Sequence, residues 1–283
     1  MKYVELNNGV KMPILGFGVL QLTDPEECER CVLDAIDVGY RLIDTAQGYG
    51  NEVAVGNAIQ KSSVPKEELF ITTKLWISGY GYEKAKKSIA GSMERLQLDY
   101  IDLLLIHHPF NDYYGTYRAM EEMYKEGKLK AIGVSNFYPD RLIDIIKFSE
   151  TVPMVNQVET HIYNQQVKAR EIMKKYGVQV QAWAPFARGK NNLFTDETLG
   201  TIGNKYNKTN AQVALRYLIQ NDVAVVPKTS KKERMIENLE VFDFELTSED
   251  MEKIADLDKG ETSFFSHQDP EQVERLVNWE RSF

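Results

Sequence analysis

The chain of 283 residues has only two cysteines and no long hydrophobic run, and both shortages limit what the protein can be. No run approaches the ~18 apolar residues of a membrane span, so we expect no membrane partner. The N-terminus, MKYVELNNGV, lacks the apolar core of a signal peptide, which predicts a cytoplasmic protein. Cys28 and Cys31 have C-x-x-C spacing, but no second ligand pair and no thioredoxin-like context accompany them. We therefore expect two ordinary thiols on a helix over 24–39.

The chain also has fewer basic residues than acidic ones, 34 against 42, which gives a net charge of −8. An acidic surface argues against a nucleic-acid partner, so an anionic ligand needs a local basic site. The apolar fraction of 43% is enough for a packed core. No linker rich in proline, glycine or serine divides the chain, which indicates one domain over residues 1–283. No large apolar surface stripe is visible either, and we expect a monomer.

Short β-branched runs recur about every 30 residues, and a stretch with helical periodicity follows most of them. The runs cover residues 14–19, 41–46, 69–75, 100–107, 130–136, 154–159, 178–183 and 223–229. Eight such units in about 250 residues predict a (β/α)₈ TIM barrel. The runner-up is an open doubly wound sheet, but Gly16-Phe17-Gly18 lacks the third glycine of the dinucleotide fingerprint and no helix follows at once.

Three regions lie outside this repeat. The extended pieces around Asn8-Gly9 predict an N-terminal β-hairpin that plugs the bottom of the barrel. The long interval after the seventh run predicts an extra loop or a short helix. The tail from about residue 258 shows no clear pattern, and we expect a short C-terminal loop there.

Polar residues that end consecutive strands of a barrel converge at its C-terminal face, where barrel enzymes build their sites. Asp44, Lys74 and His107 end the second, third and fourth runs, and Tyr49 follows in the next loop. A lysine ammonium beside a phenol lowers the pKa of the phenol, and a carboxylate keeps the lysine charged. These four residues therefore predict a proton donor for a developing alkoxide, with His107 as a second hydrogen-bond donor. The alternative is a structural Asp44–Lys74 ion pair.

The other histidines and the aromatic residues are less informative. His107 and His108 are neighbours on a predicted strand, so they are expected to point to opposite faces and not to share a metal. No other residues have metal-ligand spacing, and we predict no metal site. His161 and His267 are expected to be plain loop residues. Aromatic side chains expected to form an apolar substrate pocket at the mouth are Trp76, Phe110, Phe137 and Phe264.

Several motifs together resemble one known family, the aldo-keto reductases. The matching stretches are GYRLIDTA at 39–46, YGNE at 49–52, TKLW at 73–76, DLLLIH at 102–107, GVSNF at 133–137, NQVE at 156–159, and VPKTS at 226–230 followed by Arg234, Glu237 and Asn238. They occur in order over nearly the whole chain. The stretch SHQDP at 266–270 is similar to the bacterial and lower-eukaryotic branch, which includes reductases of diketogluconate and glyoxal type.

The resemblance implies a (β/α)₈ barrel, NADPH as cofactor, and reduction of aldehydes or ketones to alcohols. It gives Tyr49 as the general acid, Lys74 and Asp44 as its support, and His107 as the residue that orients the carbonyl. Cofactor contacts are implied for Asp44, Ser135, Asn136, Gln157, Trp183, Lys228, Thr229, Ser230, Arg234, Glu237 and Asn238. Substrate contacts are expected for His107, Trp76 and His108.

Two positions depart from the family pattern. Trp183 stands where the family usually has a tyrosine that faces the nicotinamide, although an indole can also stack. His108 stands where a tryptophan often follows the catalytic histidine, which makes the pocket wall more polar.

A basic cluster after the eighth run supports a phosphate contact. Lys228, Ser230 and Arg234 lie near a predicted helix start, where backbone N–H groups and the helix dipole favour anions. Arginine binds phosphate with two parallel hydrogen bonds, so the cluster predicts a preference for NADP over NAD. A solvated helix terminus is the alternative.

Three functions stay open at this point. The first is an NADPH-dependent carbonyl reductase. The second is an NADPH-binding regulatory subunit without significant turnover. The third is a Schiff-base aldolase that uses Lys74, although Asp44 beside it should keep the amine protonated.

Overall fold

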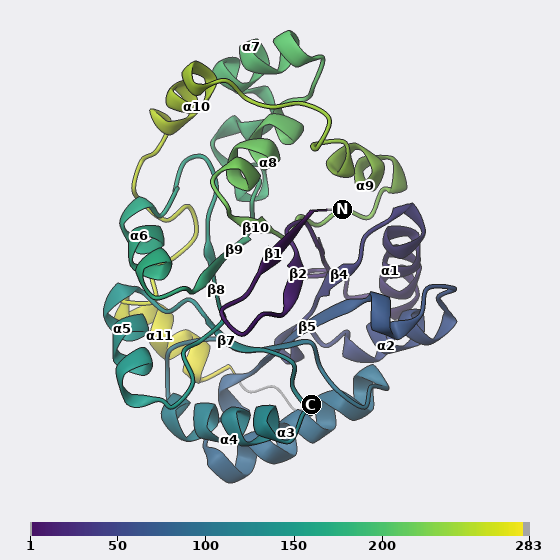
Figure 1. Cartoon of the computed structure of the whole chain (residues 1–283), viewed down its shortest axis with the longest axis vertical. Helices are drawn as coiled ribbons and strands as arrows, with labels where there is room; N and C mark the ends of the chain where they lie inside the picture. The colour runs from purple at the N-terminus through teal and green to yellow at the C-terminus, as the bar shows by residue number, and fades with distance from the viewer. Residues whose placement is uncertain (1, 280–283) are drawn as a thin grey trace.

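Eight parallel strands form the centre of the protein, and their order in the sheet follows their order in the chain. The computed structural model describes residues 2–279 (Figure 1). The strands are β3 (Phe17–Gly18), β4 (Leu42–Asp44), β5 (Phe70–Leu75), β6 (Leu103–Ile106), β7 (Ile132–Ser135), β8 (Val155–Glu159), β9 (Gln179–Trp183) and β10 (Ala224–Val225). The Gly16 N–H donates to the Val225 carbonyl at 2.8 Å, and the Val225 N–H donates to the Ile14 carbonyl at 2.8 Å. These bonds join the two edges, so the sheet closes into the predicted barrel.

Helices surround the strands in a ring (Figure 1). They are α1 (Pro25–Val38), α2 (Glu52–Lys61), α3 (Tyr82–Leu96), α4 (Tyr113–Lys125), α5 (Pro139–Phe148), α6 (Val167–Lys175), α7 (Glu197–Tyr206), α8 (Asn210–Gln220), α9 (Lys232–Leu239), α10 (Ser248–Ala255) and α11 (Pro270–Val277). Helix α1 begins as predicted, because the Asp24 side chain caps the Glu27 N–H. Cys28 and Cys31 are free and buried on α1, and burial raises the pKa of Cys28 to about 12. An unreactive thiol is the result.

The N-terminal hairpin covers one end of the barrel. Strands β1 (Tyr3–Glu5) and β2 (Lys11–Pro13) pair antiparallel, and Figure 1 shows them across the centre of the ring. The Asn7 side chain donates to the Pro153 carbonyl at 3.2 Å, just before β8, and Asn8 donates to the Lys130 carbonyl at 3.0 Å, just before β7. The hairpin therefore plugs the N-terminal end, as predicted. The C-terminal ends of the strands stay available for a site.

Two segments lie outside the regular repeat, the interval after β9 and the C-terminal tail, and only the structure of the first agrees with the prediction. The long interval after β9 holds the turn segment Ala187–Thr195 and then α7 and α8, which agrees with the expected extra structure. The tail, in contrast, contains helix α11, which we did not predict. Asp269 caps α11 and Pro270 opens it, the same signal that marks α1.

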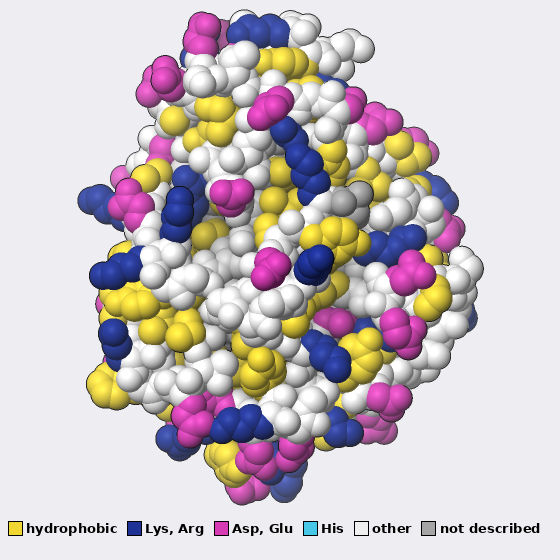
Figure 2. Space-filling view, in the orientation of Figure 1, with side chains coloured by type: hydrophobic (Ala, Val, Ile, Leu, Met, Phe, Trp, Pro, Cys, Tyr) yellow, Lys and Arg dark blue, Asp and Glu magenta, His cyan; other side chains and the backbone are white. Residues whose placement is uncertain are grey.

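The surface carries no segregation of charge on the face seen in Figure 2, where acidic and basic side chains are interspersed. Within residues 2–279, no helix combines the length and apolar character that crossing a bilayer requires.

Candidate active site

Asp44, Tyr49 and Lys74 meet at the C-terminal end of the barrel. Lys74 lies on β5 next to β4, and its side chain is fully buried. Its Nζ donates to Asp44 Oδ1 at 2.7 Å, to the Thr45 carbonyl at 2.8 Å and to the Tyr49 hydroxyl at 3.3 Å. The ammonium thus has three partners, which a buried charge needs. The phenol of Tyr49 lies at the open side of this group and is half-buried.

The charges of the group differ in part from expectation. Burial alone would lower the pKa of Lys74, but Asp44 and Tyr49 outweigh it and leave that pKa raised, so Lys74 is an ammonium at neutral pH. Burial raises the pKa of the Tyr49 phenol, and the Lys74 ammonium opposes this without reversing it. The expectation of a net lowering is therefore wrong. Tyr49 holds its proton at neutral pH, and the ammonium beside it can stabilise the phenolate once the proton has left.

His107 follows β6 and lies across from the phenol. Its ring is 5.8 Å from the Tyr49 ring and 5.2 Å from the Trp76 ring, edge-to-face in both cases. The Asn136 side chain donates to the His107 carbonyl at 2.9 Å and so fixes the backbone at this position. The four residues predicted for proton donation are therefore brought together.

His108 does not point away from His107, as strand alternation predicted. The two rings are stacked, 4.5 Å apart and only 3° from parallel. The strand β6 ends at Ile106, so the alternation of a strand no longer applies to the two histidines.

His267 is also not a plain loop residue. It is buried, and its Nε2 lies 3.0 Å from Nδ1 of His108. Burial lowers the pKa of both rings, that of His267 to about 4. The pocket wall thus contains a pair of imidazoles that are neutral at pH 7. His161, the fourth histidine, is buried beside Glu159.

A cleft of about 670 Å³ opens over these residues. Its lining includes Asp44, Tyr49, Trp76, His107, His108, Ser135, Asn136, Gln157, Trp183, Arg188, Lys228, Phe265, His267, Arg275 and Trp279. Asn136 adopts a left-handed conformation with φ of 62°, which asparagine tolerates better than most residues. Its Oδ1 accepts the Trp183 indole N–H at 2.9 Å, which fixes the indole. Gln157 donates to Asp44 Oδ2 at 2.7 Å, so Asp44 joins Lys74 to the far wall of the cleft.

The sequence of the chain matches one family model, described as the Aldo/keto reductase family, over residues 14–259. The chain belongs to the aldo-keto reductase family. The match confirms the resemblance noted from the motifs, and it makes the protein a member of a family of NAD(P)-dependent oxidoreductases.

Relatives of known name support this assignment over about nine-tenths of the chain. The glyoxal reductase of Bacillus subtilis is 48% identical over 259 residues, which cover 91% of this chain and 93% of the relative. The morphine 6-dehydrogenase of Pseudomonas putida is 41% identical over 271 residues, which cover 91% of each.

Solved structures agree as well. An aldo-keto reductase from a deep-sea metagenome library of the Medee basin has a TM-score of 0.91 and 42% identity, covering 94% of this chain and 98% of that one. A Bombyx mori aldo-keto reductase in complex with NADP has a TM-score of 0.89 and 32% identity, covering 96% of both.

The cleft of this aldo-keto reductase suits a nicotinamide. Ser135 Oγ, Asn136 Oδ1 and the Gln157 side chain line one wall, and a hydroxyl or amide oxygen can accept a second hydrogen bond besides the one it already has. The indole of Trp183 adds a flat apolar surface held in a fixed plane. Amide partners next to an aromatic face fit the carboxamide and ring of a nicotinamide.

The basic cluster after β10 is only partly free to bind an anion. Lys228 lines the cleft. Lys232 forms ion pairs with Asp34 at 3.0 Å and Asp37 at 3.8 Å, so its charge is largely balanced. Arg234 is exposed and makes no ion pair within residues 2–279.

The remaining residues predicted to contact the cofactor lie beyond the cleft. Thr229 Oγ1 accepts the Lys231 N–H at 3.2 Å, and Ser230 lies just before Lys231, the N-cap of α9. Glu237 accepts a hydrogen bond from Thr209 at 2.6 Å, and Asn238 is buried beside Tyr40. These four residues do not line the 670 Å³ cleft, whereas Lys228 does.

Several lining residues were missed, and three of the four aromatic predictions were wrong, because Phe110, Phe137 and Phe264 do not line the cleft. Arg188 lies in the turn segment after β9, and Arg275 and Trp279 belong to the unpredicted C-terminal helix region. The Asp-Pro start of α11 was the available signal. Phe137 is fully buried against Tyr113 and does not line the cleft. Phe110 packs on His108 and His267, behind the wall.

Within the described part of the chain, no group of three or more His, Cys, Asp or Glu side chains is arranged to hold a metal ion.

Proposed function

We propose that this aldo-keto reductase uses NADPH to reduce small aldehydes and ketones to alcohols, with Tyr49 as the proton donor. The observation that carries the proposal is the contact between the Tyr49 hydroxyl and the buried Lys74 ammonium, 3.3 Å apart at the open cleft. Bound NADPH would supply a hydride to the carbonyl carbon.

The protein's own part is to move a proton to the carbonyl oxygen. As the oxygen gains negative charge, the Tyr49 hydroxyl donates its proton, and the Lys74 ammonium stabilises the phenolate left behind. Asp44 keeps Lys74 in place through the 2.7 Å ion pair. His107, whose ring meets that of Tyr49 edge-to-face, would donate a second hydrogen bond to the same oxygen.

Residues on the far wall would hold the cofactor. Ser135, Asn136 and Gln157 would bind the carboxamide, and Trp183 would offer its indole face to the ring. The Asp44 carboxylate bonds to Gln157 on this wall and to Lys74 beside the proton donor, so it connects the two parts of the site.

We infer a preference for NADPH from the basic residues beyond the cleft. Lys228 faces the cleft and Arg234 is exposed without an ion-pair partner in residues 2–279, so both can meet a phosphate. The related silkworm enzyme was crystallised with NADP.

The substrate class is argued from the pocket wall. Trp76 provides an apolar side, while the neutral His108–His267 pair provides a polar one. This mixture suits short carbonyl compounds that carry a second oxygen, and the similar Bacillus subtilis enzyme is named a glyoxal reductase.

One experiment tests the proposal against its alternatives. We would measure kcat/KM for about a dozen aldehydes, dicarbonyls and ketones, with NADPH and NADH in parallel. Oxidation of NADPH across part of the panel is the expected result. Quenching of protein fluorescence by NADPH without any oxidation would instead support the alternative of an NADPH-binding subunit without turnover. Borohydride trapping of a substrate adduct on Lys74 would instead favour an aldolase.

A further inference from the structure

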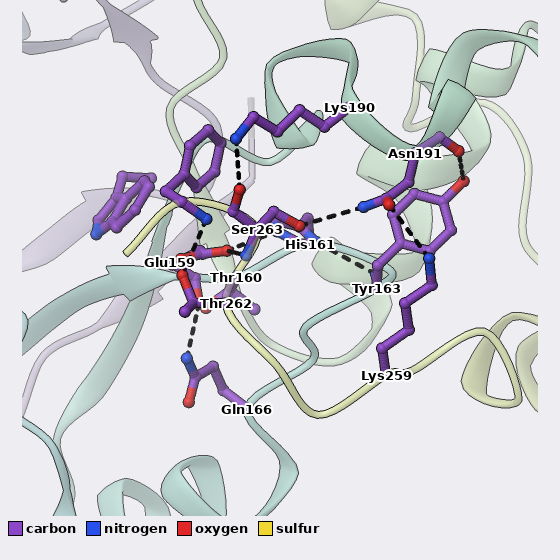
Figure 3. Close-up of polar contacts among 12 residues, drawn as sticks. Glu159, Thr160, His161, Tyr163, Gln166, Lys190, Asn191, Lys259, Thr262 and Ser263 are labelled. Atoms are coloured by element: carbon purple, nitrogen blue, oxygen red, sulfur yellow. Dashed lines mark hydrogen bonds and ion pairs between the residues drawn. The ribbon is translucent and has the colours of Figure 1, made fainter. Parts of the chain in front are cut away.

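Glu159 is a buried carboxylate that the proposed reaction does not use. It is the last residue of β8, two positions after Gln157, so strand alternation places both on the same face. Its side chain is only 6% exposed and pairs with no lysine or arginine within residues 2–279. Figure 3 shows Glu159 at the centre of a set of polar contacts that come from three separate parts of the chain.

Within residues 2–279, the partners of this carboxylate are hydrogen-bond donors and not a lysine or arginine side chain. Oε1 accepts the Ser263 N–H at 2.7 Å and His161 Nε2 at 2.9 Å, and Oε2 accepts the Thr262 hydroxyl. The Tyr163 N–H donates to His161 Nδ1 at 3.2 Å, which places the imidazole proton on Nε2. Burial would raise the pKa of Glu159, but these bonds outweigh it and leave that pKa lowered. The carboxylate is therefore charged, and both of its oxygens accept hydrogen bonds.

The bonds hold the start of the C-terminal segment, which we define as residues 260–279. Thr262 and Ser263 lead directly into Phe264, whose ring lies 5.4 Å from the Trp183 ring. Ser263 is also bonded to the turn segment after β9. Its carbonyl accepts Lys190 Nζ at 2.6 Å, and its hydroxyl accepts Asn191 Nδ2 at 3.2 Å (Figure 3).

The turn segment needs such external support because its backbone is strained. Non-glycine residues with positive φ between β9 and α7 are Ala184, Ala187, Arg188, Asn191 and Asn192. Such conformations persist only where the surroundings impose them. Tyr163 donates to the Asn191 carbonyl at 3.1 Å, and Lys259 donates to the Asn191 side chain at 3.2 Å. Ser263, held by Glu159, completes these contacts.

We propose that Glu159 is a positioning residue: by bonding to Thr262 and Ser263 it places Phe264 against Trp183, which gives the indole a second support besides its bond to Asn136. Through Ser263, the same contacts join the C-terminal segment to the turn segment. The placement of Trp183 follows from the contacts alone, whereas the effect on cofactor affinity rests on the proposed function.

The first test is made on the protein without cofactor. In Glu159→Gln, an amide N–H₂ replaces one acceptor and faces groups that are themselves donors. We expect hydrogen exchange at the Ser263 amide to become about tenfold faster. In a background with Trp76 and Trp279 replaced by phenylalanine, the fluorescence of Trp183 should shift as well. Glu261→Gln is the matched control. Glu261 is exposed on the same segment, and its replacement removes the same charge. It should change neither signal.

A second pair of variants covers the case in which Glu159→Gln fails to fold. Thr262→Val keeps the shape of the side chain and loses the hydroxyl, whereas Thr262→Ser keeps the hydroxyl. We expect Thr262→Val to reproduce the changes at Ser263 and Trp183, and Thr262→Ser to restore them. Phe264→Ala should shift the Trp183 fluorescence in the same direction, and adding it to Glu159→Gln should give little further change.

The effect on binding is measured separately. We expect the dissociation constant for NADPH to rise about tenfold in Glu159→Gln, with kcat reduced much less. Unchanged Ser263 exchange and Trp183 fluorescence in both Glu159→Gln and Thr262→Val would overturn the proposal. If those signals change but the unaltered protein binds no NADPH, the proposed function fails and the positioning role of Glu159 stands.

Discussion

The paired histidines of the cleft wall should make the protein lose stability in mild acid. His267 is only 6% exposed, with its Nε2 3.0 Å from His108. In the folded protein burial lowers the pKa of His267 to about 4, whereas an unfolded histidine titrates near ~6.5. Between these values the unfolded chain binds more protons than the folded one. The contribution of His267 to the free energy of unfolding is therefore fully present above about pH 6.5 and is lost as the pH falls toward 4.

The size of the effect follows from the same two pKa values. The folded value lies about 2.5 below the unfolded one, and each unit is worth about 1.4 kcal/mol, so His267 accounts for roughly 3 kcal/mol in full. By pH 5 about 2 kcal/mol of this is lost. His108 acts in the same direction, because burial, His267 and the Lys74 charge all lower its pKa.

The assay is urea unfolding at pH 7.5 and pH 5.0, on the unaltered protein and on His267→Gln. Glutamine places an amide near the position of Nε2 but does not titrate. The other titrating groups are shared by the two proteins, and His108, whose pKa His267 no longer lowers in the variant, adds to the difference in the same direction. The unaltered protein should lose about 2 kcal/mol more than the variant between the two pH values. Equal losses in both proteins would refute the assignment of a buried neutral imidazole to His267.

Three further predictions concern the site. Lys74→Met should lower kcat at least about 100-fold in NADPH oxidation assays, because the phenolate loses its ammonium, and near-normal turnover would exclude that role. Arg234→Ala should weaken NADPH about tenfold and leave NADH unchanged in calorimetric titrations, and an equal effect on both would remove the phosphate contact. Trp183→Phe should weaken NADPH several-fold, since the 2.9 Å bond to Asn136 that fixes the ring is lost. A dissociation constant equal to that of the unaltered protein would contradict this.

Local signals were enough to predict the architecture. The spacing of the β-branched runs indicated eight parallel strands, and Asp24-Pro25 marked the start of α1. Asp44, Lys74 and His107 were predicted to converge because they end consecutive strands. The structure places Asp44 and His107 in the lining of one cleft and Lys74 buried behind it, bonded to Asp44 and Tyr49. These inferences depend on periodicity and on the geometry of a barrel, both of which the sequence expresses directly.

Contacts between distant segments could not be predicted in the same way. The pairing of His108 with His267 spans 159 positions and depends on how the C-terminal segment folds back. The pKa of Tyr49 depends on a balance between burial and the Lys74 charge, and only the folded arrangement shows that burial prevails. Helix α11, by contrast, has a local signal in the sequence, because Asp269 and Pro270 form the same kind of start that marks α1.

The central claim is that the Tyr49 phenol gives its proton to the substrate oxygen while Lys74 stabilises the charge left behind. Single-turnover oxidation of bound NADPH by a good aldehyde substrate, in Tyr49→Phe and in the unaltered protein, tests it most directly. The account predicts that the variant binds NADPH with the same affinity and transfers hydride about 10²- to 10⁴-fold more slowly. Hydride transfer by Tyr49→Phe at a rate within a few-fold of the unaltered protein would contradict it.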